Sequence, residues 1–569
     1  MNLNEPLNLA RSALLISWAL MLVILKPQNL KIKSKWQLLV AGIPIFYVFS
    51  AIANMQNPIL ALIGNYNRNF GLLTLIAVAI LVITLTNEKI QIKSFINWGL
   101  LPTAVLSVTY SFIQSNGLDP VTWYETTRTV LTLGNSNYSA ALLGVLVVLP
   151  VYGFLNTQSK LLRTVQVVAL LLIIRSGTNT GAFQFIVLAL LIILIFLLLH
   201  YWPVIQKVSS IIRYLIFVIL TSFLGLVVIN YRSELIAQTN FADRFSQQTM
   251  ALRMFSDHPI FGVGVDQLYR YMPLYFRSED IQRVGSLSIP DKTHNLVIDH
   301  LAMGGILVGL IYLAFLIYSL CLIYKINRAG SELIYRSDFA LIAAIWITYV
   351  THLFISTDNL FMMAFGYISF GLISQLYYSK FSPKKLDRKI PDQNKNRNFN
   401  VVRVTAAVVL VVSSVVNIKA MVTDAALKKI VTNQVSSSDE ILSTLRSFPN
   451  PIAARDVIAK VFAGNQNCPL VIEASDDLLR IDNRSSHAWY FKALCSDSKN
   501  DQATALKEVE TALEYFPLSL IYLDAKVRLE FYLTNFDDAK ASLNLIKEID
   551  PGYEAIPKLE QLLEGESIS

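Results

Sequence analysis

Charge is scarce in this sequence. Only 15% of its 569 residues are charged, whereas 54% are hydrophobic. A soluble protein of this length needs far more charged surface, so the composition excludes the soluble class and indicates a membrane protein. The net charge of +8 does not indicate nucleic-acid binding, because the basic residues lie between hydrophobic runs and form no cluster on a soluble face.

Cysteine is also rare, and the three cysteines have no metal-ligand spacing. The sequence therefore predicts no metal site. Cys468 and Cys495 are interpreted as buried free thiols in helical repeats, with a disulfide as the alternative if this part of the chain is extracytoplasmic. The first hydrophobic run, 8–26, lacks a basic leader and a cleavage motif, so we expect it to be retained as a helix.

Long hydrophobic runs fill the first three quarters of the sequence. A run of about 18 apolar residues is long enough to cross about 30 Å of hydrocarbon as a helix. Residues 1–419 are therefore predicted to form an all-α, polytopic helix bundle. Its twelve predicted spans are 8–26, 36–54, 70–87, 95–114, 137–155, 161–175, 182–201, 211–230, 298–324, 337–355, 359–378 and 401–419.

Basic residues are distributed unevenly over the connections between these spans. Alternate connections carry 21 Lys and Arg, against three in the short connections on the other side. The basic side is expected to be cytoplasmic, so the long connection 231–297 and the tail 420–569 are expected to face outward. The outer connections up to residue 297 hold nine Arg and one Lys. Arginine suits bidentate phosphate recognition, although chance and salt bridges to the acids of 231–297 also explain the bias.

The tail has a regular sequence period. Pro449, Asn483, Pro517 and Pro551 are equally spaced, at intervals of about 34 residues, which is the length of a tetratricopeptide repeat. Residues 420–569 are therefore expected to form an α-solenoid of about three such repeats. Stacked helix pairs of this kind leave a groove for a protein partner, or brace a neighbouring domain.

The most informative motifs lie in the predicted outer connections. In chain order they are Arg68 in GNYNRNFGLL, Gly134, Asn135 and Asn137 in TLGNSNYSA, Arg244, the turn DHPIFGVG at 257–264, His294-Asn295, and Gly305-Ile306-Leu307. Together they resemble the elements of the O-antigen ligase and lipid-linked glycan polymerase superfamily, over most of residues 60–310. The family's Ser-Arg-Gly turn is absent, and Arg175 is the nearest arginine, which indicates a divergent member.

This resemblance implies a glycosyltransferase-C-like bundle that uses a glycan on a polyprenyl diphosphate. Arginines at the membrane surface would neutralise the departing diphosphate, and Arg68 and Arg244 are the catalytic candidates for this role. His294 is the candidate base for the acceptor hydroxyl. Inversion at the sugar and independence from metals and cofactors are also implied. The candidates for substrate binding are Arg253, Arg270, Arg277, Asn295, Asn135 and Asn137.

Simpler structural roles compete with these assignments. A histidine at a helix mouth is more often a cap or hydrogen-bonding group, and only the resemblance favours His294 as a base. Asn135 and Asn137 are expected to cap helices or tie loops, with sugar contact as the alternative. His352 and Asp358, near the outer end of the tenth span, are second-tier functional candidates because they are polar at a costly depth.

The sequence therefore predicts a plasma-membrane glycosyltransferase that transfers or polymerises glycan at the outer face. Its expected partners are the lipid-linked donor, a glycan, lipid or protein acceptor, membrane lipids, and a possible protein partner on the repeats. The alternative is a transporter of a small solute such as inorganic carbon, but we find no convincing inverted repeat. A scaffold is disfavoured because twelve spans exceed what an anchor needs.

Overall fold

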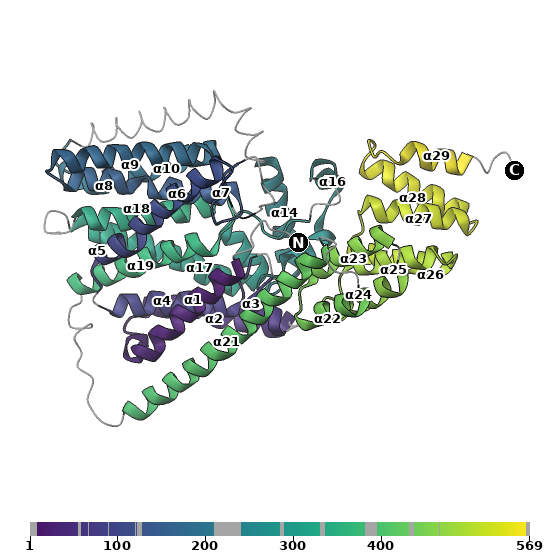
Figure 1. Ribbon diagram of the computed structural model, residues 1–569, viewed down its shortest axis with the longest axis horizontal. Helices are drawn as coiled ribbons and strands as arrows, with labels where there is room; N and C mark the ends of the chain where they lie inside the picture. Colours follow the sequence, from purple (N-terminus) through teal and green to yellow (C-terminus); the bar gives the residue numbers. More distant parts are fainter. Residues whose placement is uncertain are drawn as a thin grey trace.

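The computed structural model describes residues 8–54, 58–65, 68–88, 90–119, 121, 128–209, 241–284, 289–329, 336–354, 356–381, 395–431, 437–465 and 467–564. All regular elements in these ranges are helices, which confirms the predicted all-α class there. Figure 1 shows a bundle of long helices, with a second group of shorter helices packed at one end of it. We refer to these two parts as the bundle and the repeat domain.

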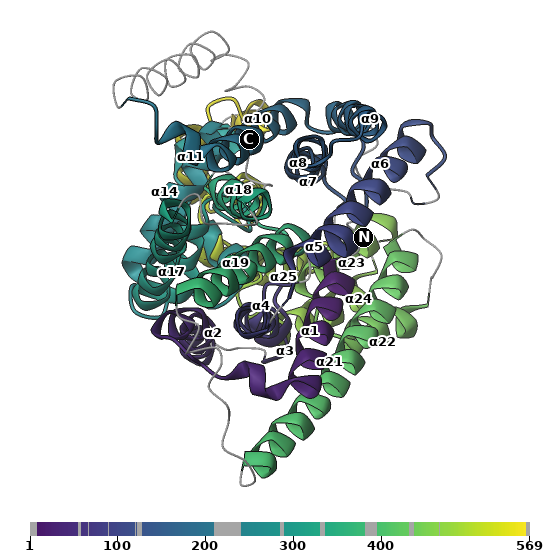
Figure 2. The same ribbon diagram turned by 90° about the vertical axis from the view of Figure 1, so that its left-hand side faces the viewer.

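The bundle contains most of the long helices. Its helices are α1 (Asn8–Leu25), α2 (Lys35–Asn54), α3 (Pro58–Ile63), α4 (Leu72–Asn87), α5 (Ile92–Phe95), α6 (Leu101–Ser115), α7 (Ser136–Leu146), α8 (Val148–Asn156), α9 (Lys160–Thr178), α10 (Ala182–His200), α11 (Trp202–Ile205), α14 (Phe241–Asp257), α15 (Leu268–Tyr271), α16 (Ser278–Val284), α17 (Leu296–Arg328), α18 (Arg336–Leu353) and α19 (Leu360–Phe381). Short helical turns are η1 (Pro27–Leu30), η2 (Ile96–Leu100) and η3 (Met272–Tyr275). The long helix α21 (Lys395–Val431) packs along α1, as Figure 2 shows, and leads to the repeat domain.

Eleven of the twelve predicted spans coincide with helices or with consecutive helices, and the remaining one, 211–230, lies outside the described residues. Within the described ranges, eight helical segments are long and apolar enough to cross a membrane. Helices α1 and α4 are apolar but shorter, and α18 is not among the eight. The chain is thus a helical membrane protein, and the number of twelve spans stays a prediction.

An aromatic cluster joins three helices within the bundle. Trp346 of α18 is fully buried, and its ring centroid lies 5.1 Å from Phe370 of α19 and 5.8 Å from Phe315 of α17. Aromatic side chains bury a large apolar area and pack in defined orientations. These contacts fix α17, α18 and α19 relative to one another.

Helix α17 is broken at Gly305, whose φ is 75°. The turn between α14 and α15 is inserted at this break and takes over the hydrogen bonds that a continuous helix would make. Val263 N donates to Ala302 O at 2.9 Å, and Ile306 N donates to Pro259 O at 2.8 Å. The glycines of the DHPIFGVG and Gly-Ile-Leu motifs therefore meet one another, which explains their spacing in the sequence.

The repeat domain is built from helices that pack in sequential order. They are α22 (Ser438–Ser447), α23 (Pro451–Asn465), α24 (Cys468–Ile481), α25 (Ser486–Asp497), α26 (Gln502–Tyr515), α27 (Leu520–Tyr532), α28 (Phe536–Ile549) and α29 (Ile556–Glu564). The C-caps of α24, α26 and α28 are Asp482, Phe516 and Asp550, which are evenly spaced along the chain. Helix pairs thus recur with the predicted period, and their assignment as tetratricopeptide repeats stays a prediction.

The interpretation of two free thiols in this domain is wrong. Cys468, at the start of α24, and Cys495, in α25, form a disulfide with Cα atoms 5.3 Å apart. Helices α24 and α25 pack against each other, which brings together two cysteines separated by 27 residues. This proximity comes from the packing of the helix pair, which the spacing alone did not specify.

Replacement of Gly305 by alanine is expected to destabilise the bundle. An added Cβ atom would clash with the carbonyl group of Ile260, and the left-handed backbone costs a residue with a side chain about 1 kcal/mol or more. We expect a lower melting temperature in detergent for Gly305→Ala. The matched control is Gly42→Ala in α2, whose added Cβ makes only ordinary contacts, 3.5 Å from Ile311. Equal melting temperatures for both variants would contradict this description of the break.

Candidate functional site

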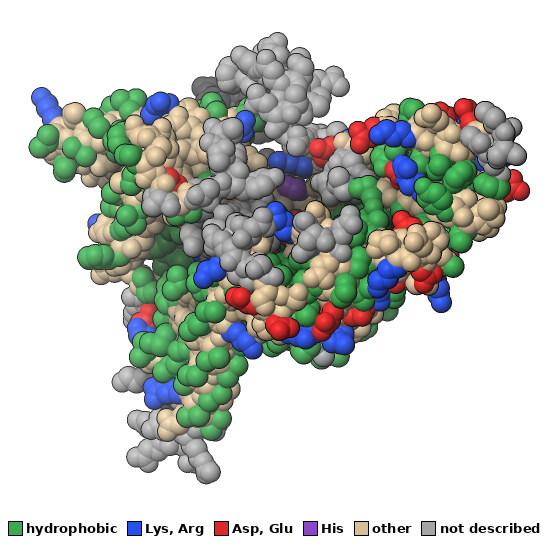
Figure 3. All heavy atoms as spheres, turned by 45° about the vertical axis from the view of Figure 1, so that its right-hand side comes forward, with side chains coloured by type: hydrophobic (Ala, Val, Ile, Leu, Met, Phe, Trp, Pro, Cys, Tyr) green, Lys and Arg blue, Asp and Glu red, His purple; other side chains and the backbone are tan. Residues whose placement is uncertain are grey.

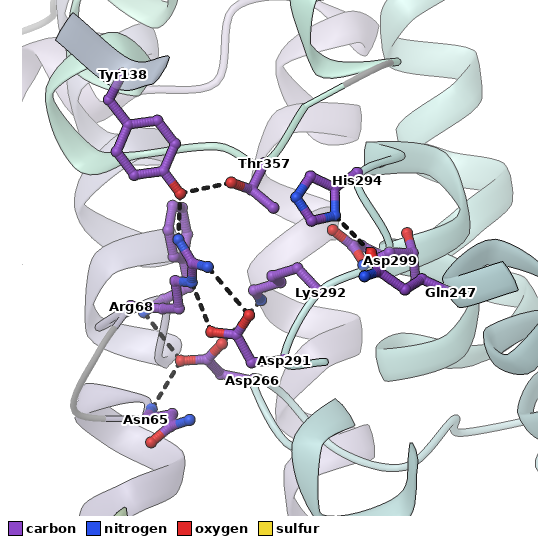
Figure 4. A network of polar contacts seen from close by, with 12 residues as sticks. Asn65, Arg68, Tyr138, Gln247, Asp266, Asp291, Lys292, His294, Asp299 and Thr357 are labelled. Atoms are coloured by element: carbon purple, nitrogen blue, oxygen red, sulfur yellow. Dashed lines mark hydrogen bonds and ion pairs between the residues drawn. The ribbon is translucent and has the colours of Figure 1, made fainter. Parts of the chain in front are cut away.

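The end of the bundle that faces the repeat domain gathers polar side chains from connections far apart in the sequence. Figure 4 shows the residues of this network, which are Asn65, Arg68, Tyr138, Gln247, Asp266, Asp291, Lys292, His294, Asp299 and Thr357. Figure 3 shows basic and histidine side chains within a hollow at the junction of the two parts. The connections that contribute them are those predicted to lie on one side of the membrane.

Arg68, in the connection between α3 and α4, is held by a bidentate ion pair. Its Nε and Nη2 donate to the two carboxylate oxygens of Asp291 at 2.7 and 3.0 Å. Its Nη1 donates to the hydroxyl group of Tyr138, which also contacts the hydroxyl group of Thr357. Burial alone would raise the pKa of Asp291, but the Arg68 charge and its hydrogen bonds lower that pKa to about 2. The guanidinium group is therefore charged and fixed in orientation at the N-terminal end of α4.

A second ion pair lies deeper in the same end. Lys292 Nζ lies 2.8 Å from Asp266 Oδ1, and the two side chains are only 7% and 2% exposed. The other carboxylate oxygen of Asp266 accepts hydrogen bonds from the backbone N–H groups of Asn65 and Phe70. Burial opposes the charge of Lys292, but Asp266 and Asp299 outweigh it and raise its pKa. Asp266 thus connects Lys292, in the segment before α17, to the backbone at the N-terminal end of α4.

His294 lies two residues before α17 in a left-handed backbone conformation, with φ 58°. This conformation is uncommon for a residue with a side chain and occurs at functional sites. Its Nδ1 lies 2.7 Å from Gln247 Oε1 of α14. Because the amide oxygen can only accept, Nδ1 carries the proton and Nε2 keeps a lone pair. The imidazole is therefore oriented as a base would be.

Two guanidinium charges act on this imidazole. Burial, then the charge of Arg244 and then that of Arg68, lower the pKa of His294 to about 3. Burial also lowers the pKa of Arg244, which belongs to α14. His294 is thus neutral near pH 7, within the field of two cations from separate segments. The structure brings the three predicted catalytic residues, Arg68, Arg244 and His294, together.

A mostly apolar pocket lies beside these ion pairs, and α2, α4, α17 and α19 contribute to its walls. Its polar lining includes Tyr47, Lys292, Asp299, His300 and Asp358. Tyr47 Oη lies 2.6 Å from His300 Nδ1, which gives His300 a hydrogen bond inside the bundle. Within the described ranges, no group of three or more His, Cys, Asp and Glu side chains is arranged to hold a metal ion.

Two of the predicted arginines make contacts away from His294. Arg270 Nε donates to Asp482 Oδ1 of the repeat domain at 2.7 Å. Arg253 Nη2 donates to Tyr275 O at 2.6 Å and to Asp280 Oδ2 at 3.1 Å. Both side chains thus join pieces of protein, and the substrate binding expected for them stays a prediction.

The remaining substrate-binding candidates lie at helix ends or on the surface. Asn295 is the N-cap of α17, and its side chain accepts hydrogen bonds from two backbone N–H groups of the first turn. Asn135 caps α7 in the same way by accepting from Asn137 N. The side chains of Asn137 and Arg277 are exposed. The structural alternative given for Asn135 is therefore the contact that the structure describes.

Sequence reasoning missed several members of the network. Asp291 and Lys292 precede His294 closely, and Tyr138 follows Asn137, so each lies next to a motif that was identified. Gln247 and Thr357 also lie near candidates, Arg244 and Asp358, but only the tertiary fold places them beside His294 and Tyr138. The acidic partner of an arginine cannot be chosen from a sequence that offers many carboxylates.

The second-tier candidates are also buried at this end. His352 is 2% exposed, and neither of its ring nitrogens has a hydrogen-bond partner among the described residues. Asp358 Oδ2 accepts from the hydroxyl group of Tyr349 at 2.6 Å. Burial raises the pKa of Asp358 to about 7. Both residues adjoin the network and are candidates for contact with a bound molecule.

Part of the chain matches a known family. A family profile described as O-antigen ligase matches residues 164–313. Residues 164–313 are similar to an O-antigen ligase domain. This match covers about a quarter of the chain and includes Arg244 and His294. No curated protein matches the chain.

The electrostatic coupling of His294 to Arg244 is testable without substrate. Arg244→Gln is expected to raise the pKa of His294 from about 3 toward its ordinary value near 6.5, because one repelling cation is removed. Histidine NMR titration in detergent measures this, with His294→Gln as the assignment control. Arg277→Gln, an exposed arginine between η3 and α16, should leave the titration unchanged. An unaltered His294 pKa in Arg244→Gln would contradict the coupling.

Proposed function

We propose that this protein is an integral-membrane glycosyltransferase that transfers or polymerises glycan from a polyprenyl diphosphate onto an acceptor at the outer face of the plasma membrane. The O-antigen ligase match supports a glycan ligase or polymerase. The observation that carries the proposal is the convergence of Arg68, Arg244 and His294 from three separate segments. The transporter alternative is not favoured by this match.

In this proposal the diphosphate binds between Arg68 and Arg244. As the bond from the anomeric carbon to the phosphate oxygen breaks, negative charge collects on the departing diphosphate. Guanidinium groups that are already oriented stabilise such charge without reorganising, and a site shielded from water strengthens the effect. Asp291 holds the Arg68 guanidinium by two hydrogen bonds, so it acts as a positioning residue.

His294 is the proposed base. Its Nε2 takes the proton of the acceptor hydroxyl group while the oxygen attacks the anomeric carbon from the face opposite the diphosphate, which inverts the configuration. A pKa of about 3 makes the free site a weak base. A bound diphosphate neutralises part of the charge of Arg244 and Arg68, so donor binding raises the pKa of His294 and prepares it to accept a proton.

Three observations support an outward-facing site. The site and the repeat domain share one end of the bundle (Figure 1). The repeat domain contains the disulfide Cys468–Cys495, and disulfides persist in oxidising compartments outside the cytoplasm. The distribution of basic residues over the connections assigns the same sidedness. The acceptor is a glycan, lipid or protein hydroxyl group, and the chemistry of the site is the same for each.

Substitution of the three residues tests the proposal. His294→Ala, Arg68→Ala and Arg244→Ala are each expected to lower glycan transfer in proteoliposomes by about 100-fold or more. Donor lipids extracted from the native membrane serve as substrate, and lectin or gel shift measures the product. Arg480→Ala is the matched control, because its side chain is 76% exposed in α24 of the repeat domain. Full activity in all three variants would overturn the site assignment.

The acid limb of the pH profile gives a second test. Because His294 has a pKa of about 3 before the donor binds, kcat/KM should not fall near pH 6.5 as pH is lowered. The bound diphosphate raises that pKa, so kcat should begin to fall at a higher pH than kcat/KM does. A limb near pH 6.5 in kcat/KM that disappears in His294→Ala would contradict the predicted resting state.

A further inference from the structure

The outer loop of the bundle runs along the repeat domain in register with its repeats. Three evenly spaced loop residues, Arg270, Phe276 and Gln282, each contact the domain. Their partners are Asp482, Phe516 and Ile549, which lie at the ends of successive helix pairs. Each step from one loop contact to the next thus matches one repeat of the domain.

The first of these contacts is a buried ion pair. Arg270 and Asp482 have side chains only 4% and 7% exposed, and Nε lies 2.7 Å from Oδ1. Arg270 Nη2 also lies 3.4 Å from Asn483 Oδ1. Asn483 occupies the position that is proline in the other repeats, at Pro517 and Pro551. The departure from the repeat pattern therefore supplies a partner for the loop arginine.

The other two contacts differ in chemistry. The ring centroids of Phe276 and Phe516 lie 5.5 Å apart. Gln282 Nε2 donates to Ile549 O, at the end of α28, at 2.7 Å. The guanidinium group of Arg484 also lies 4.3 Å from the ring centroid of Tyr271. An ionic, an aromatic and a backbone contact thus occur at successive repeats.

Neighbouring residues of the same loop contact α14. Asp280, in α16, accepts from Arg253 and Ser246 of α14 and from Arg277 N. Tyr275, in η3, donates to Asp257 Oδ2 at the end of α14. Helix α14 also carries Gln247, which hydrogen-bonds His294. A continuous series of contacts therefore leads from the repeat domain through the loop and α14 to the imidazole.

We propose that the repeat domain is a positioning part of the active site, and that Arg270 and Asp482 are positioning residues for α14 and its contact with His294. When a buried ion pair loses one partner, the remaining charge is uncompensated. The loop that carries Arg270 would then move so that this charge reaches solvent. A shift of about 1 Å in a residue that orients a base can lower a rate by about 100-fold. The effect on transfer rests on the proposed function, whereas the effect on α14 does not.

Charge exchange tests this proposal. Arg270→Asp and Asp482→Arg are each expected to lower kcat by about tenfold to 100-fold with little change in KM, and the double exchange should recover most of the loss. A purely destabilising role would not predict recovery in kcat. The control is Lys547→Gln, which removes the exposed ion pair of Lys547 with Glu560 in the same domain.

Hydrogen exchange of residues 241–257 in the full-length protein separates this inference from the proposed function. Each single charge-reversal variant should speed amide hydrogen exchange in α14, and the double variant should restore the protection of α14. Wild-type transfer and wild-type protection of α14 in both single variants would overturn the positioning role. So would a double variant that stays as exchange-labile as the single ones. If the wild-type protein transfers no glycan, the proposed function fails. The hydrogen-exchange data still decide the positioning role of the repeat domain.

Discussion

One buried and one partly buried carboxylate–cation pair hold together the end of the bundle that faces the repeat domain. Asp291 fixes Arg68, and Asp266 pairs with Lys292 while accepting hydrogen bonds from the backbone at the mouth of α4. Removing one partner of such a pair leaves an unpaired charge in a poorly solvated place, so the loss of either pair would destabilise the fold. The mouths of α4 and α17 are therefore held side by side, and His294 is presented between α14 and the ion pairs.

The arrangement also explains why a neutral histidine lies among cations. Burial and the charges of Arg244 and Arg68 keep the His294 imidazole deprotonated, so its Nε2 lone pair is available. In the proposed reaction, the anionic donor neutralises part of the positive charge that Arg244 and Arg68 place around His294. Binding of the donor and the basicity of His294 are thus linked, which limits proton uptake in the absence of substrate.

Much of the fold follows from the sequence, because span length and the positive-inside rule act locally and additively. Eleven predicted spans and the regular period of the tail reappear in the described helices, and the motif residues Arg68, Arg244 and His294 meet as expected. The protein partners of Arg270 and Arg253 did not follow, because an arginine's partner depends on the docking of distant segments. The disulfide Cys468–Cys495 was given only as the alternative to two free thiols, since the choice between them depends on helix packing.

Binding of a soluble polyprenyl diphosphate analogue tests the central claim most directly. Geranyl diphosphate, titrated calorimetrically into the purified protein in detergent, is predicted to bind, and Arg68→Gln or Arg244→Gln should each weaken its affinity by about tenfold or more. Arg480→Gln, at an exposed arginine of α24, should leave the affinity unchanged. Equal affinity in wild type and in both site variants would show that these guanidinium groups do not receive the diphosphate.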